Sequence, residues 1–351
     1  MINQAFVLGA GLGTRLRPLT DDLPKPLIPI FQKPLITFAL DHLLSLGVES
    51  FIINTHHRPE KFADVFRMDA TGLAGRDAAL RRPEGENLAL PDGRRSAASL
   101  PKGSLPSSYR DREITFQHEP VLLGTGGGIK NVEGLLRTEP FIVYSGDLLT
   151  DLDLEPLIDE HFRKENDVTL ALRKTGLAAE MALKNGRVVD IGNKYGHAGE
   201  YDFANVSIWN PKIFQRIPPA QSISFIPILA DWIGQGGKVG GVVHDDGKWF
   251  NIGSRAEYLE VHRIIQEEGW KPGYVSMAEW PVQVAADAVV DPSARLSGYY
   301  SVGARCRVDA AAIVENTILW PGAQIASRSH LRNCIVRSDR KVEGEQNDTD
   351  I

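Results

Sequence analysis

The sequence has few cysteines, no excess of basic residues and no long apolar run. Only Cys306 and Cys334 occur among its 351 residues, which is too few for a disulfide framework and lacks the spacing of metal ligands. The formal net charge of -6 argues against a broad nucleic-acid-binding surface. No window reaches the roughly 18 apolar residues of a membrane span, and the first residues lack a cationic leader. We therefore expect a cytoplasmic protein with no nucleic-acid partner and no membrane partner.

The most informative segment is a glycine-rich loop that follows a short apolar strand at residues 5–8. Gly9, Gly11 and Gly13 allow consecutive backbone N–H groups to turn toward one concavity, where an anion can sit. Arg15 follows with a guanidinium that can hold two phosphate oxygens, and Lys25 stands between two prolines that restrict its position. Glycines after a strand are most often only a tight turn, but the cations beside them favour a nucleotide site.

Apolar periodicity alternates between strands and helices up to about residue 172. Further strands are expected at 51–53, 114–117, 141–144 and 168–172, with helical spacing in several of the intervals. This alternation predicts an α/β fold with a Rossmann-like, mostly parallel sheet, whose ligands lie outside the carboxyl ends of the strands. Residues 69–112 interrupt the pattern because they are rich in Gly, Pro, Ser, Ala and Arg. We expect a flexible insertion there, either disordered or a loose lid.

A different repeat occupies the C-terminal part. Aliphatic residues recur at intervals of six at Val284, Val290, Leu296, Val302, Val308 and Val314. Four of them are followed four positions later by a small residue: Ala288, Ala294, Cys306 and Ala312. One aliphatic residue in six, with a small residue beside it, is the pattern of a β-helix with a narrow interior. Hexapeptide β-helices also carry acyl transfer, but the only histidine here, His330, is isolated.

The pattern G-x-G-T-R-L-x-P-L-T at 11–20, followed by P-K-P-L-x-P at 24–29, resembles the signature of the sugar-1-phosphate nucleotidylyltransferases. The resemblance implies an enzyme that joins a nucleoside triphosphate and a sugar 1-phosphate into a nucleotide sugar and pyrophosphate, with Mg²⁺, or Mn²⁺ in its place. It implies a nucleotidyltransferase domain at 1–270 and a short left-handed β-helix at 280–337. We expect a frayed polar tail at 338–351 and a homo-oligomer formed through the β-helix.

The resemblance also implies the site residues. Arg15, Lys25 and Asp147 are the expected catalytic group, with Asp147 as a metal ligand at the end of the strand 141–144. Contacts to the nucleotide are expected from Leu8, Gly9, Gly11, Gly13, Thr14, Arg15, Glu119, Gly124, Thr125 and Gly126. For Glu119 a structural role is the alternative. Lys194 and Asn205 match the segments that bind the sugar phosphate, although a solvated lysine is an equal alternative for Lys194.

Asn251 departs from the family pattern, which carries a second metal-binding aspartate at this position. An amide oxygen can coordinate Mg²⁺ but brings no negative charge. The chain is then either a subfamily that tolerates asparagine or a catalytically silent regulatory subunit. The β-helix favours a mannose-1-phosphate guanylyltransferase, whereas the stretches TGGGI and PFIVYSGD look like uridylyltransferases acting on N-acetylmuramate 1-phosphate or another hexose 1-phosphate.

Overall fold

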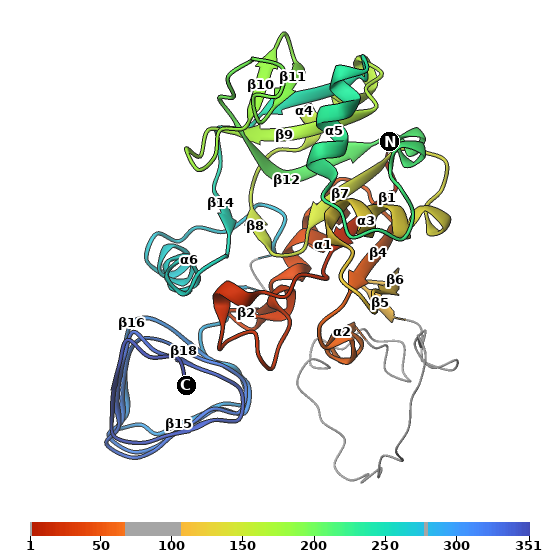
Figure 1. Cartoon of the computed structure of the whole chain (residues 1–351). Helices are drawn as coiled ribbons and strands as arrows, with labels where there is room; N and C mark the ends of the chain where they lie inside the picture. Colours follow the sequence, from red (N-terminus) through yellow and green to blue (C-terminus); the bar gives the residue numbers. More distant parts are fainter. Residues whose placement is uncertain (1, 67–106, 277–279) are drawn as a thin grey trace. The chain divides into compact units, whose positions relative to one another are not determined.

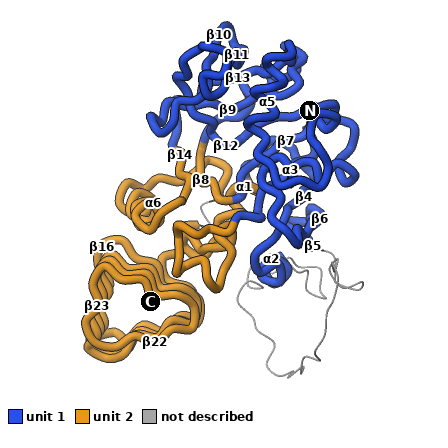
Figure 2. Tube along the Cα trace, in the orientation of Figure 1, with its two compact units in different colours: residues 1–11, 42–146, 152–248 blue, residues 12–41, 147–151, 249–351 orange. Residues whose placement is uncertain are grey.

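The computed structural model describes residues 2–66, 107–276 and 280–351, and every structural statement below concerns these residues. The chain divides into two compact units. Unit 1 comprises residues 1–11, 42–146 and 152–248, and unit 2 comprises residues 12–41, 147–151 and 249–351 (Figure 2). Residues 12–41, which hold the signature, and residues 147–151 group with the C-terminal part in unit 2. The predicted domain boundary between 270 and 280 stays a prediction.

Unit 1 is built on one mixed sheet of ten strands (Figure 1). In spatial order these are β10 (Met181–Lys184), β11 (Arg187–Ile191), β13 (Val239–Val243), β9 (Val168–Arg173), β12 (Asp202–Trp209), β7 (Phe141–Ser145), β1 (Gln4–Leu8), β4 (Ser50–Thr55), β6 (Arg112–His118) and β5 (Ser107–Tyr109). The central strands β7, β1, β4 and β6 run parallel, as does the pair β9 and β13. The predicted fold class is therefore confirmed, although β12 runs antiparallel to both of its neighbours.

Most of the predicted insertion at 69–112 lies outside the described residues. Its last part is corrected by the structure, because β5 pairs antiparallel with β6 as the edge of the sheet, with Tyr109 opposite Arg112. The short hairpin between them turns at Arg110 and Asp111, both of which have positive φ. Polar residues suit an edge strand, which is why this segment lacks apolar periodicity.

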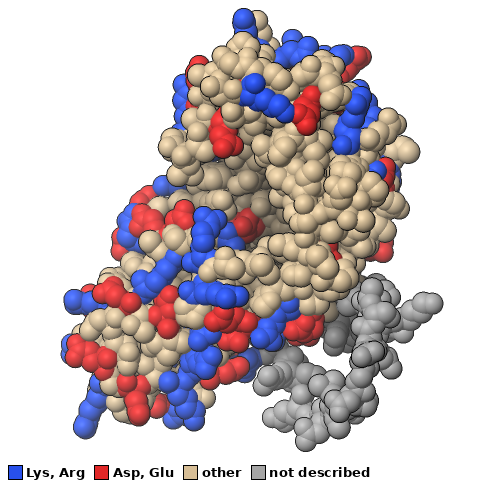
Figure 3. Space-filling model, viewed as in Figure 1, with Lys and Arg blue, Asp and Glu red and all other residues tan. Residues whose placement is uncertain are grey.

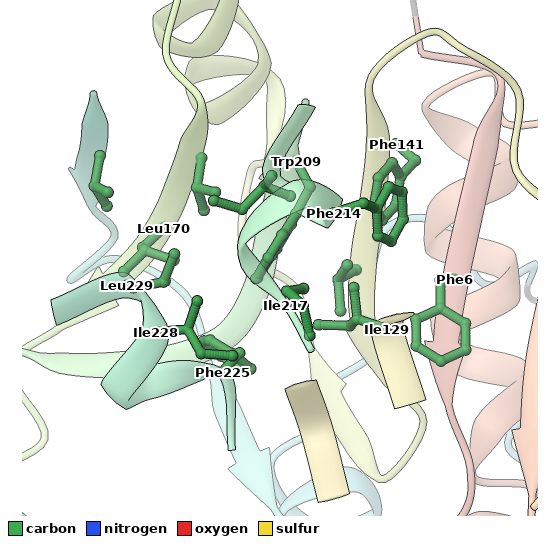
Figure 4. Close-up of a cluster of buried hydrophobic side chains, with 14 of the residues drawn as sticks. Phe6, Ile129, Phe141, Leu170, Trp209, Phe214, Ile217, Phe225, Ile228 and Leu229 are labelled. Atoms are coloured by element: carbon green, nitrogen blue, oxygen red, sulfur yellow. The ribbon is translucent and has the colours of Figure 1, made fainter. Parts of the chain in front are cut away.

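The helices of unit 1 are α2 (Pro59–Phe66), α3 (Gly124–Asn131), α4 (Glu155–Arg163) and α5 (Phe225–Gly234), while α1 (Ile36–Ser45) crosses from unit 2 into unit 1. The apolar faces of α3 and α5 belong to a large buried cluster (Figure 4). Phe6 of β1, Phe141 of β7 and Ile129 of α3 belong to it, and Phe141 stacks on Phe214 with ring centroids 5.6 Å apart. This core fixes the strands whose carboxyl ends carry the glycine loops.

Unit 2 joins the signature segment to the C-terminal part of the chain. It contains the hairpin of β2 (Pro29–Ile30) and β3 (Lys33–Pro34), the pair of β8 (Leu148–Thr150) and β14 (Trp249–Asn251), and α6 (Arg255–Glu267). Three buried side-chain hydrogen bonds tie these parts together: Tyr258 Oη to Pro29 O (2.5 Å), Trp280 Nε1 to Ile30 O (2.9 Å) and Trp320 Nε1 to Tyr258 Oη (2.9 Å). The signature segment therefore shares one core with α6 and the C-terminal coils.

Short parallel strands form the C-terminal coils: β15 (Val289–Val290), β16 (Arg295–Val302), β17 (Arg307–Val308), β18 (Ile313–Leu319), β19 (Gln324–Ile325), β20 (His330–Arg332), β21 (Ile335–Val336), β22 (Lys341–Val342) and β23 (Glu345–Asn347). Val290 pairs with Val308 and Leu296 with Val314, so each partner lies three six-residue repeats further on. The pairing produces the three-sided coil of a parallel β-helix (Figure 1).

The prediction of a frayed tail at 338–351 is wrong. β22 and β23 continue two faces of the β-helix, and Ile351 N donates to Ile335 O at 2.9 Å. Val342 is buried in the coil, whereas its neighbour Lys341 is exposed. The tail reads as polar because most of its side chains face outward, while strand pairing satisfies its backbone. Homo-oligomer formation through the β-helix stays a prediction.

Candidate active site

Two of the three predicted catalytic residues, Lys25 and Asp147, meet within unit 2. Lys25 lies in a short 3-10 helix, Lys25–Leu27, between two prolines, and its Nζ forms a direct ion pair with Asp147 Oδ2. The Lys25 side chain is only 9% exposed, whereas that of Asp147 is 24% exposed. The ammonium is therefore held in a fixed place, and the carboxylate keeps access to solvent.

Gly13 of the signature loop packs against Thr20 and the base of the Lys25 side chain. It has φ 62°, and a side chain there would lie 2.8 Å from Thr20 Cγ2 and 3.1 Å from Lys25 Cβ. Thr20 Oγ1 also donates to Gly13 O at 2.8 Å. Only glycine fits this conformation and this space. Thr14 and Arg15 follow in the short helix Thr14–Leu16, and both are exposed.

Asn251 lies on the strand that pairs with the residues directly after Asp147. β14 pairs antiparallel with β8, which places Asn251 opposite Leu148, the residue after Asp147. Side chains cap the start of α6: Ser254 Oγ accepts from Glu257 N at 3.2 Å, and Glu257 Oε2 accepts from Gly253 N at 2.8 Å. This cap fixes the turn between β14 and α6.

Arg15 lies along this same turn. A side chain on Gly253 would begin 3.5 Å from Arg15 Cζ. Unit 2 thus brings the predicted cations Arg15 and Lys25 to the same turns as Asp147 and Asn251. These four residues come from three segments that are far apart in the sequence.

The oxygen ligands of this group suit a hard divalent cation. Mg²⁺ binds proteins through one or two carboxylates and completes its shell with water and phosphate oxygens. Asp147 supplies a partly exposed carboxylate, and Asn251 an amide oxygen on the neighbouring strand. The described residues contain no cluster of three or more His, Cys, Asp or Glu side chains that could hold a metal by themselves. A cation here would depend on its substrate for further ligands.

In unit 1, Gly9 and Gly11 differ in their burial and in their contacts. Gly9 is buried and its N–H donates to Asn54 Oδ1 at 2.8 Å, while an added Cβ would lie 2.7 Å from Asn54 O. Its N–H is therefore engaged inside the protein, which corrects the expectation that it faces a phosphate. Gly11 is exposed and has open space around its Cα. The expectation of an anion-binding N–H rests on Gly11 and the residues after it.

Packing inside unit 1 constrains the second glycine-rich segment, residues 124–128. Gly126 is buried, its N donates to Ile223 O at 2.8 Å, and an added Cβ would lie 3.0 Å from that oxygen. Gly124 has φ 68° and is half-buried. Thr125 Oγ1 accepts from Phe225 N at 3.2 Å. The close approach of residues 223–225, which no sequence pattern indicates, accounts for Gly126.

The burial and hydrogen bonds of Glu119 fit a structural role, which is the alternative to nucleotide binding. Glu119 is 1% exposed, and its carboxylate accepts from Asn54 Nδ2 at 2.7 Å and from Leu123 N at 3.0 Å. Both oxygens are thus engaged inside unit 1. Direct contact of this carboxylate with a nucleotide, which the sequence comparison with the family implied, does not fit this burial.

A pocket of about 180 Å³ opens within unit 1 at the carboxyl ends of β1 and β7. It brings together three predicted site residues, Leu8, Thr125 and Asn205. Asn205 sits at a bulge of β12 with φ 64°, a conformation that asparagine tolerates better than most residues. The sequence did not single out the other lining residues, which are Val143, Ser145, Phe203, Ser224, Phe225 and Ile226. An apolar wall with a few hydroxyl and amide groups suits a small polar ligand.

Lys194 does not line this pocket. Its ammonium forms an ion pair with Asp231, and the two side chains are 45% and 59% exposed. The hydrogen bond to Asp231 raises the pKa of Lys194. This arrangement is that of a solvated surface lysine, the alternative that the sequence left open.

Charges of both signs are interspersed over the β-helix on the face that Figure 3 shows. This mixture gives that face no extended basic patch of the kind that holds nucleic acid. None of the described helices is long and apolar enough to cross a membrane.

The sequence profile described as "Nucleotidyl transferase" matches residues 4–268. The chain belongs to the nucleotidyl transferase family. The match includes the signature loop, Asp147 and Asn251, and it ends at the last turn of α6. The resemblance seen in the sequence is thereby confirmed, and the chain is an enzyme of the nucleotidyltransferase class.

Relatives of this nucleotidyl transferase cover most of its length. A mannose-1-phosphate guanylyltransferase of Mycobacterium tuberculosis is 28% identical over 92% of this chain and 80% of its own. An N-acetylmuramate alpha-1-phosphate uridylyltransferase of Neisseria meningitidis is 26% identical over 76% of this chain and 100% of its own. A UDP-glucose pyrophosphorylase, solved with UDP-glucose, has a TM-score of 0.57 at 18% identity, over 76% of this chain and 100% of its own. That structure supports the fold of the nucleotidyl transferase part.

Proposed function

We propose that this nucleotidyl transferase joins GTP and mannose 1-phosphate into GDP-mannose and pyrophosphate. The observation that carries the reaction class is the group in unit 2, where buried Lys25 contacts Asp147 beside Asn251. The choice of substrates rests on the match to the mycobacterial guanylyltransferase, which spans 92% of the chain and so extends beyond the family profile.

The reaction needs no covalent enzyme intermediate. A phosphate oxygen of the sugar 1-phosphate attacks the α-phosphorus in line, and the bond from that phosphorus to the bridging oxygen of the pyrophosphate group breaks. The nucleophile is already an anion, so the protein has to position two anions and offset their charge. Arg15, which is exposed, holds the departing β- and γ-phosphates. Lys25 stabilises the charge that develops at the α-phosphate, because its restricted ammonium needs no reorganisation.

Asp147 and Asn251 would hold Mg²⁺, with Mn²⁺ as the alternative ion. Bound there, the cation would offset phosphate charge and orient the triphosphate. Because Asn251 is neutral, Asp147 has to supply all of the protein's negative charge toward the ion. Lys25 already contacts the same carboxylate, so it also holds Asp147 in a fixed orientation.

Unit 1 supplies the parts that recognise the substrates. Gly11, Gly124 and Thr125 are half-buried or exposed and can contact the nucleotide. The pocket that Leu8, Thr125 and Asn205 share is the proposed site of the sugar. Lys194 would have to leave Asp231 to reach a sugar phosphate, so we assign it no part in the reaction.

The test is a grid of pyrophosphate release with purified protein. GTP, UTP, dTTP, ATP and CTP are each combined with mannose, glucose, N-acetylglucosamine and N-acetylmuramate 1-phosphates, with Mg²⁺ and with Mn²⁺. We expect release from GTP with mannose 1-phosphate. Release that is faster with another pair would keep the reaction class and reject the proposed substrates.

Two other candidates have an observation of their own. The whole length of the Neisseria uridylyltransferase matches 76% of this chain. This match favours UTP with N-acetylmuramate 1-phosphate as the second substrate pair. Asn251 favours a silent regulatory subunit, which would bind a nucleotide sugar without turnover. Silence across the grid that neither Mn²⁺ nor Asn251→Asp relieves would select the regulatory subunit.

A further inference from the structure

A buried asparagine and a buried glutamate link the two glycine-rich segments of unit 1. Asn54 lies near the carboxyl end of β4, and Glu119 directly follows β6. Gly9 N donates to Asn54 Oδ1 (2.8 Å), and Asn54 Nδ2 donates to Glu119 Oε1 (2.7 Å). Leu123 N, at the start of α3, donates to Glu119 Oε2 (3.0 Å). Three hydrogen bonds therefore run from the loop after β1 to the first turn of α3.

We call this chain of hydrogen bonds from Gly9 through Asn54 and Glu119 to Leu123 the relay. The direction of each hydrogen bond in it is fixed. Asn54 has to turn its oxygen toward the N–H of Gly9 and its amino group toward the carboxylate of Glu119. Both side chains are 1% exposed, so water cannot replace a lost partner. An unpaired polar group buried in this way is strongly unfavourable. The relay therefore tolerates neither a second donor nor a second acceptor at its centre.

The surroundings hold the relay in place. Glu119 N donates to Thr55 O at 2.7 Å, and His56 Nδ1 lies 2.7 Å from Glu119 O. Gly128 packs against the relay, since an added Cβ would lie 2.9 Å from Glu119 Oε1 and 3.0 Å from Asn54 Nδ2. The carboxylate also lies at the N-terminus of α3, where negative charge is favoured.

We propose that Asn54 and Glu119 are positioning residues for nucleotide binding. Neither side chain reaches solvent, so neither can touch the substrate as the protein stands. Instead the relay sets the spacing between the loop that leads to Gly11 and the turn that carries Thr125. The inference rests on the proposed function, because it takes both segments to contact the nucleoside triphosphate.

The experiment exchanges the two functional groups. Glu119→Gln places an amino group against the amino group of Asn54. Asn54→Asp places its carboxylate against that of Glu119. Each single variant therefore leaves one mismatched pair. The double variant Asn54→Asp/Glu119→Gln restores every pair: the new carboxylate accepts from Gly9 N and from the new amide, whose oxygen accepts from Leu123 N. Exposed Asn131 of α3 and Glu113 of β6 give a control pair with the same changes, Asn131→Asp and Glu113→Gln.

We expect each single relay variant to raise KM for the triphosphate at least tenfold, equivalent to about 1.4 kcal/mol, and to lower the melting temperature. The double variant should return KM to within about threefold of the wild type, which is the coupling that a direct pair requires. The control variants should leave KM unchanged. A double variant no better than the worse single variant would refute the relay. Single variants that lose stability but keep the wild-type KM would refute the positioning role.

Gly128→Ala provides a second perturbation if the single variants do not fold. It pushes one methyl group toward both relay side chains, and it should raise KM for the triphosphate, whereas Gly134→Ala, which meets no atom within 4 Å, should not. An unchanged KM in Gly128→Ala would count against the proposal. If the wild type releases no pyrophosphate, the proposed function fails, and the same variants are compared by equilibrium dialysis with GTP. Absence of GTP binding to the wild type would overturn both proposals.

Discussion

Replacing Lys25 with methionine is the sharpest test of the charge arrangement in unit 2. The change keeps most of the side-chain length and removes only the ammonium. Because this side chain is 9% exposed, solvent screens its charge little. Removing one preorganised stabilising donor from an active site costs roughly 2.7–4 kcal/mol of transition-state stabilisation, which lowers kcat by about 10² to 10³. Saturating substrates and measured pyrophosphate release give kcat directly.

The effect on stability should be smaller than the effect on catalysis. Asp147 loses its contact with Lys25 but is 24% exposed. The loss in the free energy of unfolding should therefore fall between the ~1 kcal/mol of surface pairs and the ~3–5 kcal/mol of buried ones. Lys33→Met is the matched control, because Lys33 pairs with Asp41 at 2.7 Å in the same unit, with side chains 13% and 2% exposed. Because Asp41 is more buried than Asp147, Lys33→Met should lower the free energy of unfolding at least as much, and it should leave kcat within about threefold. A Lys25→Met enzyme that keeps kcat within threefold would refute the reasoning.

Three further changes test other parts of the structure. Asn251→Asp adds a negative charge beside Asp147 and should lower the Mg²⁺ concentration for half-maximal activity several-fold in a titration; an unchanged midpoint would reject Asn251 as a ligand. Arg337 donates to Pro18 O (3.2 Å) and Asp22 (3.0 Å), so Arg337→Ala should speed hydrogen exchange in residues 13–27, and unchanged exchange would show that the β-helix does not brace the loop. Burial lowers the pKa of His262 to about 4; the unfolded chain therefore binds its proton first, and the free energy of unfolding should fall by up to ~1.4 kcal/mol per pH unit between pH 6.5 and 4. Urea unfolding should show that slope weakened in His262→Phe, and a slope equal to that of the wild type would contradict the assignment.

The sequence anticipates those parts of the fold whose signal is local. The apolar runs 5–8, 51–53, 141–144 and 168–172 all became central strands, because strands buried on both faces are continuously apolar. The sequence pattern does not predict β12 (DFANVSIW), because the bulge at Asn205 interrupts the alternation of apolar residues. The tail was misjudged because a β-helix turns more of its residues to solvent than a sheet between helices does.

The residues of the candidate site likewise divide into those with a local sequence signal and those without one. The resemblance names Lys25, Asp147 and Asn251 from three separate segments, and the structure places all three in unit 2; their roles stay predictions. Asn54 was missed, although a polar residue at the end of an apolar strand was a usable signal. The role of Gly126 could not be deduced, since its packing partner Ile223 lies about a hundred residues away and carries no local mark.

Direct detection of the nucleotide sugar is the measurement that tests the central claim most closely. Wild-type protein, Asp147→Ala and Lys25→Met are incubated with GTP, mannose 1-phosphate and Mg²⁺, and the products are separated and identified by mass spectrometry. The account predicts GDP-mannose and pyrophosphate in equal amounts with the wild type, and at least a hundredfold slower formation with either variant. GDP-mannose formed equally fast by all three proteins, or no nucleotide sugar from any triphosphate and sugar phosphate of the grid, would contradict it.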